Sequence, residues 1–266
     1  MRHSRAVLGF DRRLKLEWLD RAASLRRDHD KVADVRIALD EYLGSRVAGD
    51  AKGGARSKTR SVLMRTWALP REDVRDLAEA ALKLFPDVTA SQRLALHWGM
   101  LMASYPFFFD ATTRLGRLLR LQDSVELAQL TRRVTETWGQ RSTVPRAVQR
   151  VVRSLVDWRV LSEGKERGRF SRASKLVEVR DEALSLWLVE AVVVASRDRA
   201  LSIELAIQHP CLFPFRVTAT PSTLARSRLF EVVRHGLNES VVVVRERPSR
   251  VDRSAKARGS GSRGAR

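Results

Sequence analysis

Apolar residues recur at every third or fourth position along most of the chain, a spacing that places them on one face of an α-helix. One such run lies within residues 11–29, and a second occupies residues 30–43. The pattern continues through residues 61–137, where Pro70 begins one helix and Pro86 ends it. A helical N-terminal region is therefore predicted.

Two stretches are apolar on nearly every side. Residues 94–109 and 184–195 are short for a bilayer span and each contains an ionisable residue, so both are predicted to be buried core helices. The aromatic cluster at residues 105–109 is also assigned to the core, because aromatics this dense among apolar neighbours more often pack than stack on bases. The same reasoning places Trp138 and Trp158 in the core.

Residues 45–60 interrupt the helical pattern with a polar, glycine-containing and basic segment. Its GGARSKT sequence lacks the G-x-x-x-x-G-K-[ST] spacing of a phosphate-binding loop, and it follows no apolar strand. We interpret it as a basic loop that either touches phosphates or extends into solvent.

The pattern becomes mixed in the last third of the chain. A helix is predicted over residues 222–237 and a β-branched strand over residues 241–244. Residues 201–207 fit either a strand or a helix. Residues 246–266 consist mostly of serine, glycine, arginine and lysine, and we predict that this tail is disordered because it has too little apolar surface to bury.

These patterns predict a mainly α protein. Its parts are a helical domain at residues 1–121 with a basic loop at 45–60, a central unit at 122–180, a small helical or α+β region at 181–245, and the basic tail at 246–266. The length of 266 residues is sufficient for one large or two small cores.

Charge adds a functional indication. The chain has 50 Lys and Arg residues against 31 Asp and Glu residues, a formal net charge of +19. Such a field attracts polyanions, and nucleic acid is the usual partner. The alternative is an arginine-rich composition set by codon usage; the clustering of the basic residues favours nucleic acid.

The single cysteine, Cys211, excludes an internal disulfide framework and a multi-cysteine zinc site, and it fits a reducing compartment. The first residues contain no apolar run typical of a secretory leader. A cytoplasmic protein with no membrane partner is expected.

Residues 141–161, RSTVPRAVQRVVRSLVDWRVL, predict a helix with two chemically different faces. Ser142 or Thr143 can cap it, and Pro145 falls in the first turn. Its apolar face comprises Ala147, Val148, Val151, Val152 and Leu155. Its outer face comprises Arg146, Gln149, Arg150 and Arg153.

This outer face contains no acid before Asp157, so i,i+4 pairs cannot neutralise it. It therefore needs an external anion or a facing acidic surface, unless it is simply a solvated basic face. Arginine can bridge guanine O6 and N7 in the major groove, and glutamine can pair with adenine N6 and N7.

The neighbouring elements favour nucleic acid. A predicted helix at residues 124–137 and a short turn precede the two-faced helix; a strand at 160–161, a loop at 164–168 and a returning strand at 169–170 follow it. This order, with the S-T-x-x-R-A start (142–147), the V-V-x-x-L core (151–155) and the D-W-R-V-L exit (157–161), resembles the winged helix-turn-helix family. The family usually has glycine before the final Val-Leu, where this chain has Arg159.

The resemblance implies a recognition helix at residues 144–158 in the major groove of double-stranded DNA and a wing at residues 162–170. Basic residues in and beside that wing would hold the DNA backbone. These residues are Lys165, Arg167, Arg169 and Arg172.

A basic, mostly helical protein around such a unit is also similar to accessory DNA-binding proteins of bacterial anti-phage systems, such as the BrxA-like proteins of BREX islands. The resemblance implies a regulator or the DNA-binding subunit of a larger bacterial system. Two other functions stay open: a scaffold that docks other protein subunits, and RNA binding, which shares the charge argument.

No enzymatic motif is apparent. The histidines form neither H-E-x-x-H nor H-x-x-x-H, and no G-x-S-x-G elbow is present. His209 lies two residues from Cys211, and we expect a structural role for both. The protein is predicted not to be an enzyme and to need no metal or cofactor.

Overall fold

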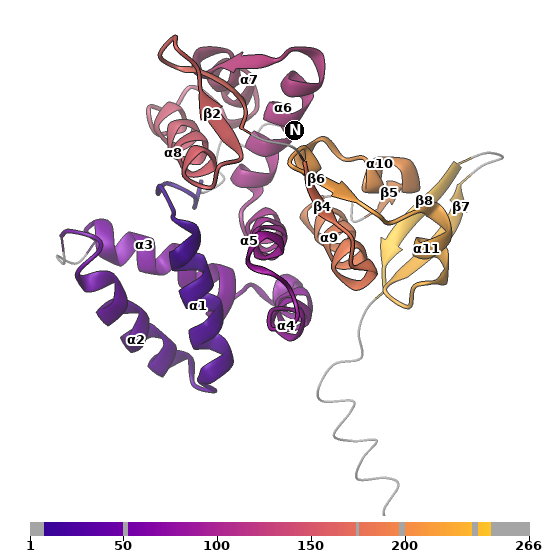
Figure 1. The fold of residues 1–266 in the computed structure, drawn as a ribbon, viewed down its shortest axis with the longest axis horizontal. Coiled ribbons are helices and arrows are strands. Elements are labelled where there is room, and N and C mark those ends of the chain that lie inside the picture. The colour runs from indigo at the N-terminus through magenta and orange to yellow at the C-terminus, as the bar shows by residue number, and fades with distance from the viewer. Residues whose placement is uncertain (1–7, 50–52, 174–175, 197–199, 236–238, 246–266) are drawn as a thin grey trace, which may run out of the picture.

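The computed structural model describes residues 8–49, 53–173, 176–196, 200–235 and 239–245. The predicted disordered tail lies outside these residues. The chain is mostly helical with three small sheets (Figure 1), which confirms the mainly α fold class.

The helices are α1 (Leu16–Asp28), α2 (Val32–Gly44), α3 (Ala55–Leu63), α4 (Arg75–Leu84), α5 (Ala90–Ser104), α6 (Pro106–Leu121), α7 (Leu127–Trp138), α8 (Thr143–Asp157), α9 (Glu182–Ala195), α10 (Ile203–Ile207) and α11 (Pro221–Arg226). Three short turns are η1 (Met64–Ala68, a π-helix), η2 (Glu72–Val74) and η3 (Pro210–Leu212). The strands are β1 (Ser124–Glu126), β2 (Leu161–Glu163), β3 (Arg169–Arg172), β4 (Val177–Val179), β5 (Ala200–Ser202), β6 (Phe215–Val217), β7 (Phe230–His235) and β8 (Glu239–Val244).

The strands form separate sheets. An antiparallel sheet of order β1-β3-β2 lies beside α7 and α8, and β4 pairs with β6 in parallel. The third sheet, β5-β8-β7, is antiparallel and lies at the C-terminal end of the fold (Figure 1).

The main core is built around α5, and the predicted buried stretch 94–109 covers most of this helix and the first turn of α6. Residues 94–104 of this helix are all buried. Gly99 allows the ring of Trp187 on α9 to approach closely, since a Cβ at Gly99 would lie 2.6 Å from that ring. Gly116 of α6 similarly meets the carbonyl oxygen of Pro210 in η3, where a Cβ would collide with backbone. Both glycines thus set distances between packed elements.

Burial confirms the core assignments made from the pattern. Helix α9 is buried over nearly its whole length. Trp138 and Trp158 are buried, as are Tyr105, Phe107 and Phe108 of the aromatic cluster. One boundary is new: α5 ends at residue 104 and α6 begins at Pro106, because a proline favours the first turn of a helix.

Four predicted elements are wrong in part. The helix predicted over residues 11–29 begins at Leu16, so Leu14 lies outside it. The helix over residues 222–237 ends at Arg226, and β7 follows because Val232 and its neighbours pair with β8. The helix expected from Ser124 begins at Leu127, since residues 124–126 pair with β3. The loop over residues 45–60 is shorter, because α3 begins at Ala55. The ambiguous segment 201–207 contains both β5 and α10.

Within the part of the chain that the structure describes, no helix combines the length and the apolar character that crossing a bilayer requires.

Candidate nucleic-acid interface

Helices α7 and α8 are joined by a turn in which Gly139 has a φ of +81°, a left-handed conformation that glycine adopts readily. After α8, the chain runs through β2, a loop at residues 164–168 and β3. This loop is fixed at both ends: Gly164 N donates to Arg169 O at 2.8 Å, and Leu127 N donates to Gly168 O at 2.8 Å. The second bond ties the loop to the first residue of α7.

The two faces predicted for α8 are present in the structure. The apolar face, comprising Val144, Ala147, Val148, Val151, Val152 and Leu155, is buried. Arg146, Gln149 and Arg150 are exposed on the outer face. Ser142 is the N-cap as expected, but its hydroxyl makes no capping hydrogen bond, and Pro145 lies in the first turn.

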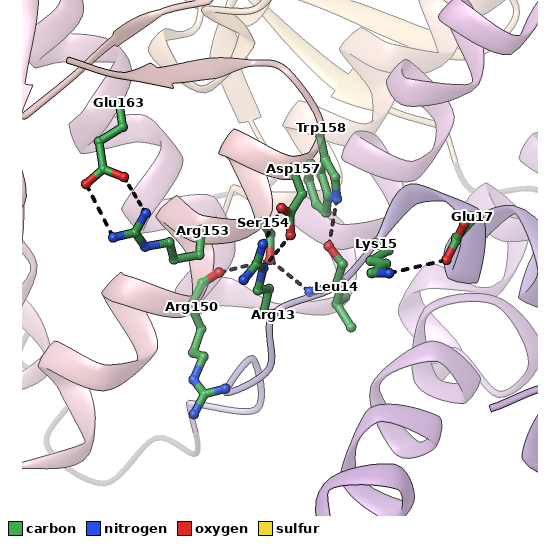
Figure 2. Close-up of polar contacts among 10 residues, drawn as sticks. All are labelled: Arg13, Leu14, Lys15, Glu17, Arg150, Arg153, Ser154, Asp157, Trp158 and Glu163. Atoms are coloured by element: carbon green, nitrogen blue, oxygen red, sulfur yellow. Dashed lines mark hydrogen bonds and ion pairs between the residues drawn. The ribbon is translucent and has the colours of Figure 1, made fainter. Parts of the chain in front are cut away.

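The outer face of α8 was expected to have no acidic partner within the protein, but Arg153 has one. Its guanidinium donates two hydrogen bonds to the carboxylate of Glu163 on β2, at 2.5 and 3.3 Å (Figure 2). The guanidinium also lies 5.8 Å from the centre of the Phe170 ring. These bonds, with a further one from Gly168 N at 3.2 Å, lower the pKa of Glu163. Arg153 therefore links α8 to β2, and Glu163 neutralises its charge.

The basic residues of the predicted wing divide in the same way. Lys165 and Arg167 are exposed on the loop. Arg169 pairs with Glu126 at 2.8 Å and with Glu166 at 3.2 Å. Arg172 is exposed, and its guanidinium donates to the carbonyl of Leu119 at 3.1 Å.

The eight residues predicted from the sequence thus form two groups. Arg153, Arg169 and Arg172 hold elements of the protein together. Among the described residues, the other five make neither an ion pair nor a side-chain hydrogen bond. These five are Arg146, Gln149, Arg150, Lys165 and Arg167.

A groove of about 850 Å³ separates the loop from α7 and α8. Arg146, Gln149 and Arg167 line it together with Arg132 of α7, an exposed residue that the sequence reasoning did not select. Its helical position, on the outward side of the helix preceding the turn, was the available signal. Glu126, Glu136 and Glu166 also line the groove, so its charge is mixed.

An N-terminal segment without helix or strand, residues 8–15, packs against the end of α8. Figure 2 shows its residues Arg13 and Leu14 beside that end. Leu14 N donates to Ser154 Oγ at 2.9 Å, and Trp158 Nε1 donates to Leu14 O at 2.8 Å. The guanidinium of Arg13 donates two hydrogen bonds of 2.5 Å to the carboxylate of Asp157. We call this segment the N-terminal strap. The sequence pattern predicts a helix here instead, because Leu14 continues the helical spacing of the apolar residues of α1.

The strap is anchored by apolar burial as well. Phe10 and Leu14 are fully buried. The Phe10 ring packs edge-on to that of Tyr105 at 5.8 Å and lies 5.2 Å from that of Phe108. The strap therefore joins the N-terminal helices, α6 and α8 in one core.

His209 and Cys211 lie together away from this surface. The Cys211 sulfur is 2.9 Å from His209 Nδ1, and both residues are buried. Burial raises the pKa of the Cys211 thiol and lowers that of His209 to about 4. Since both groups are then neutral near pH 7, the pair lacks the thiolate that a cysteine nucleophile needs.

The described residues contain no group of three or more His, Cys, Asp or Glu side chains placed to bind a metal ion. Comparisons with protein-family models, curated proteins and solved structures found no match for this chain.

Proposed function

We propose that this protein binds double-stranded DNA through a winged helix-turn-helix within residues 122–180, as a regulator or as the DNA-binding subunit of a larger bacterial system. The observation that carries the proposal is the outer face of α8. Arg146, Gln149 and Arg150 project from a helix whose other face is buried, and no acid among the described residues pairs with the two arginines.

The dimensions suit the major groove. Helix α8 has 15 residues, or a length of about 22 Å at 1.5 Å per residue. The groove is about 12 Å wide and admits one helix. Arg146 and Arg150 would read guanine edges, and Gln149 would read adenine.

The neighbouring loop supplies the positioning contacts. Lys165 and Arg167 are exposed there and would hold phosphates, which set register without reading sequence. Arg153 and Arg169 act as positioning residues: their pairs with Glu163 and Glu126 fix the angle between the loop and the helices.

The proposal is tested by anisotropy of a labelled duplex across a salt series. Substitution of Arg146 and Arg150 by alanine is expected to cost about 1–3 kcal/mol for each arginine that contacts a base. A matched control removes Arg75 and Lys83, two exposed basic residues of α4, and should bind as the wild type does.

Equal affinity of the wild type and the α8 variant would refute the proposed role of α8. Structured RNA is included as competitor: displacement of duplex at equal concentration would favour RNA binding instead. A wild-type protein that ignores both nucleic acids but co-purifies stoichiometrically with one partner would favour the scaffold function.

A further inference from the structure

A second basic surface lies on α3, outside the proposed winged helix. Lys58, Ser61 and Arg65 are exposed at successive turns along α3 and its continuation η1. Neither Lys58 nor Arg65 belongs to an ion pair among the residues described. Arg56 and Arg60 both pair with Asp40 of α2, at 3.7 and 2.5 Å.

The segment that contains this surface has basic residues but no acidic ones. Every charged residue within 53–71 is an arginine or a lysine. The N-cap residue of α3 is Gly54, which provides no side-chain cap, and no acid lies in the first turn of the helix. Positive side chains near the positive end of a helix are unfavourable, so α3 carries an electrostatic cost that a polyanion would offset.

The position of α3 is fixed relative to α8. Tyr105 Oη donates to the carbonyl of Val62 in α3 at 3.0 Å, and the Arg65 guanidinium lies 5.7 Å from the centre of the same tyrosine ring. Phe10 of the N-terminal strap packs on that ring, and Leu14 of the strap is bonded to α8. A chain of buried contacts thus connects the two basic helices.

The two helices also lie near each other in the fold. Figure 1 shows α3 and α8 on either side of the N-terminal strap. Arg150 points away from the Arg153–Glu163 and Arg13–Asp157 pairs (Figure 2). It therefore extends the basic surface beyond the groove that faces the loop.

We infer that α3 is a second phosphate-binding surface for the same DNA duplex, with Lys58 and Arg65 contacting the backbone that flanks the segment bound by α8. This inference rests on the proposed DNA binding. We expect α3 to contact the sugar–phosphate backbone and not base edges. Its exposed basic side chains have only Ser61 beside them, and lysine and arginine on such a surface bind phosphates without reading sequence. The N-terminal strap holds α3 and α8 in fixed relative positions. The protein should therefore cover a longer stretch of duplex than a winged helix alone would cover.

The test compares Lys58→Ala/Arg65→Ala with wild type on two labelled duplexes, of one helical turn (about 10 base pairs) and of three turns. On the long duplex, the slope of log affinity against log salt should fall in magnitude by about 1.8, or about 0.9 for each lost phosphate contact. On the short duplex the two proteins should bind alike. Arg75→Ala/Lys83→Ala is the matched control, with the wild-type slope on both duplexes.

Outcomes separate this inference from the proposed function. An unchanged slope for the α3 variant on the long duplex, with the wild type binding normally, overturns the inference alone. An equal loss on both duplexes overturns the flanking position of the contact. If the wild type binds neither duplex, the proposed function fails and the inference fails with it. Circular dichroism verifies that each variant is folded.

Discussion

Individual side chains on the outer face of α8 have different roles that the helical pattern does not separate. Arg146, Arg150 and Arg153 repeat at helical spacing, and Arg153 alone meets an acid, Glu163, ten residues downstream. Pair rules within a helix reach only three or four positions. The sequence therefore predicts which residues face outward, but not which of them another element neutralises.

The isosteric substitution Glu163→Gln, which removes the carboxylate charge and keeps the shape of the side chain, separates the two roles that Arg153 could have. If Arg153 is a positioning residue, Glu163→Gln and Arg153→Ala both release the loop, and both weaken duplex binding in an anisotropy titration. If Arg153 contacts DNA directly, Glu163→Gln frees it and binding becomes tighter. Stronger binding by Glu163→Gln would thus contradict the positioning role.

The same contact predicts a pH dependence. Arg153 and Gly168 N lower the pKa of Glu163 in the folded protein, so this contribution to stability is complete above the ordinary glutamate pKa and is lost as the pH falls through the lowered one. Carboxyl NMR titration should show a depressed pKa in wild type and a near-ordinary pKa in Arg153→Ala. An ordinary pKa in both proteins would contradict the pair.

The buried thiol gives a further prediction at this scale. Because burial raises its pKa, Cys211 should react slowly with a thiol reagent at pH 8 in the folded protein and rapidly in denaturant. Comparing the two rates measures protection. Rapid modification of the native protein would contradict the neutral, buried pair with His209.

Helices were predictable where the spacing or density of apolar residues in their own sequence indicates the buried side. The apolar face of α8 and the buried α5 and α9 follow from periodicity alone. The sequence pattern predicts a helix where β7 lies because Leu229, Val232 and Val233 also fit helical spacing, and the antiparallel pairing of Val232 with Val242 of β8 decides its structure. The N-terminal strap likewise depends on residues outside its own sequence. It contacts α6 and α8, which lie more than 90 residues away along the chain.

The strap should contribute substantially to stability. Leu14 is fully buried, so Leu14→Ala should lower the free energy of unfolding by about 2–5 kcal/mol. Leu69, which is 59 % exposed, is the matched control, and Leu69→Ala should change it by less than about 0.5 kcal/mol. Urea denaturation measures both. Equal, small effects would mean that the strap is not part of the core.

At the scale of the whole molecule, the net charge of +19 indicates a polyanionic partner but does not say where it binds. In the fold, α8, the loop at residues 164–168 and α3 each present exposed basic side chains for which the described residues provide no ion pair, while other arginines pair with neighbouring acids. Burial of Phe10 and Leu14 joins these surfaces in one body. Such a distribution cannot be predicted from composition, because it depends on which acids meet which bases after folding.

The central claim is that the outer face of α8 meets DNA. Photo-crosslinking from position 149 tests it most directly, with a benzophenone side chain in place of Gln149 and the same substitution at Lys83 on α4 as control. The account predicts a duplex adduct from position 149, reduced by added salt, and none from position 83. Absence of an adduct at position 149 in a protein that binds the duplex would contradict the account.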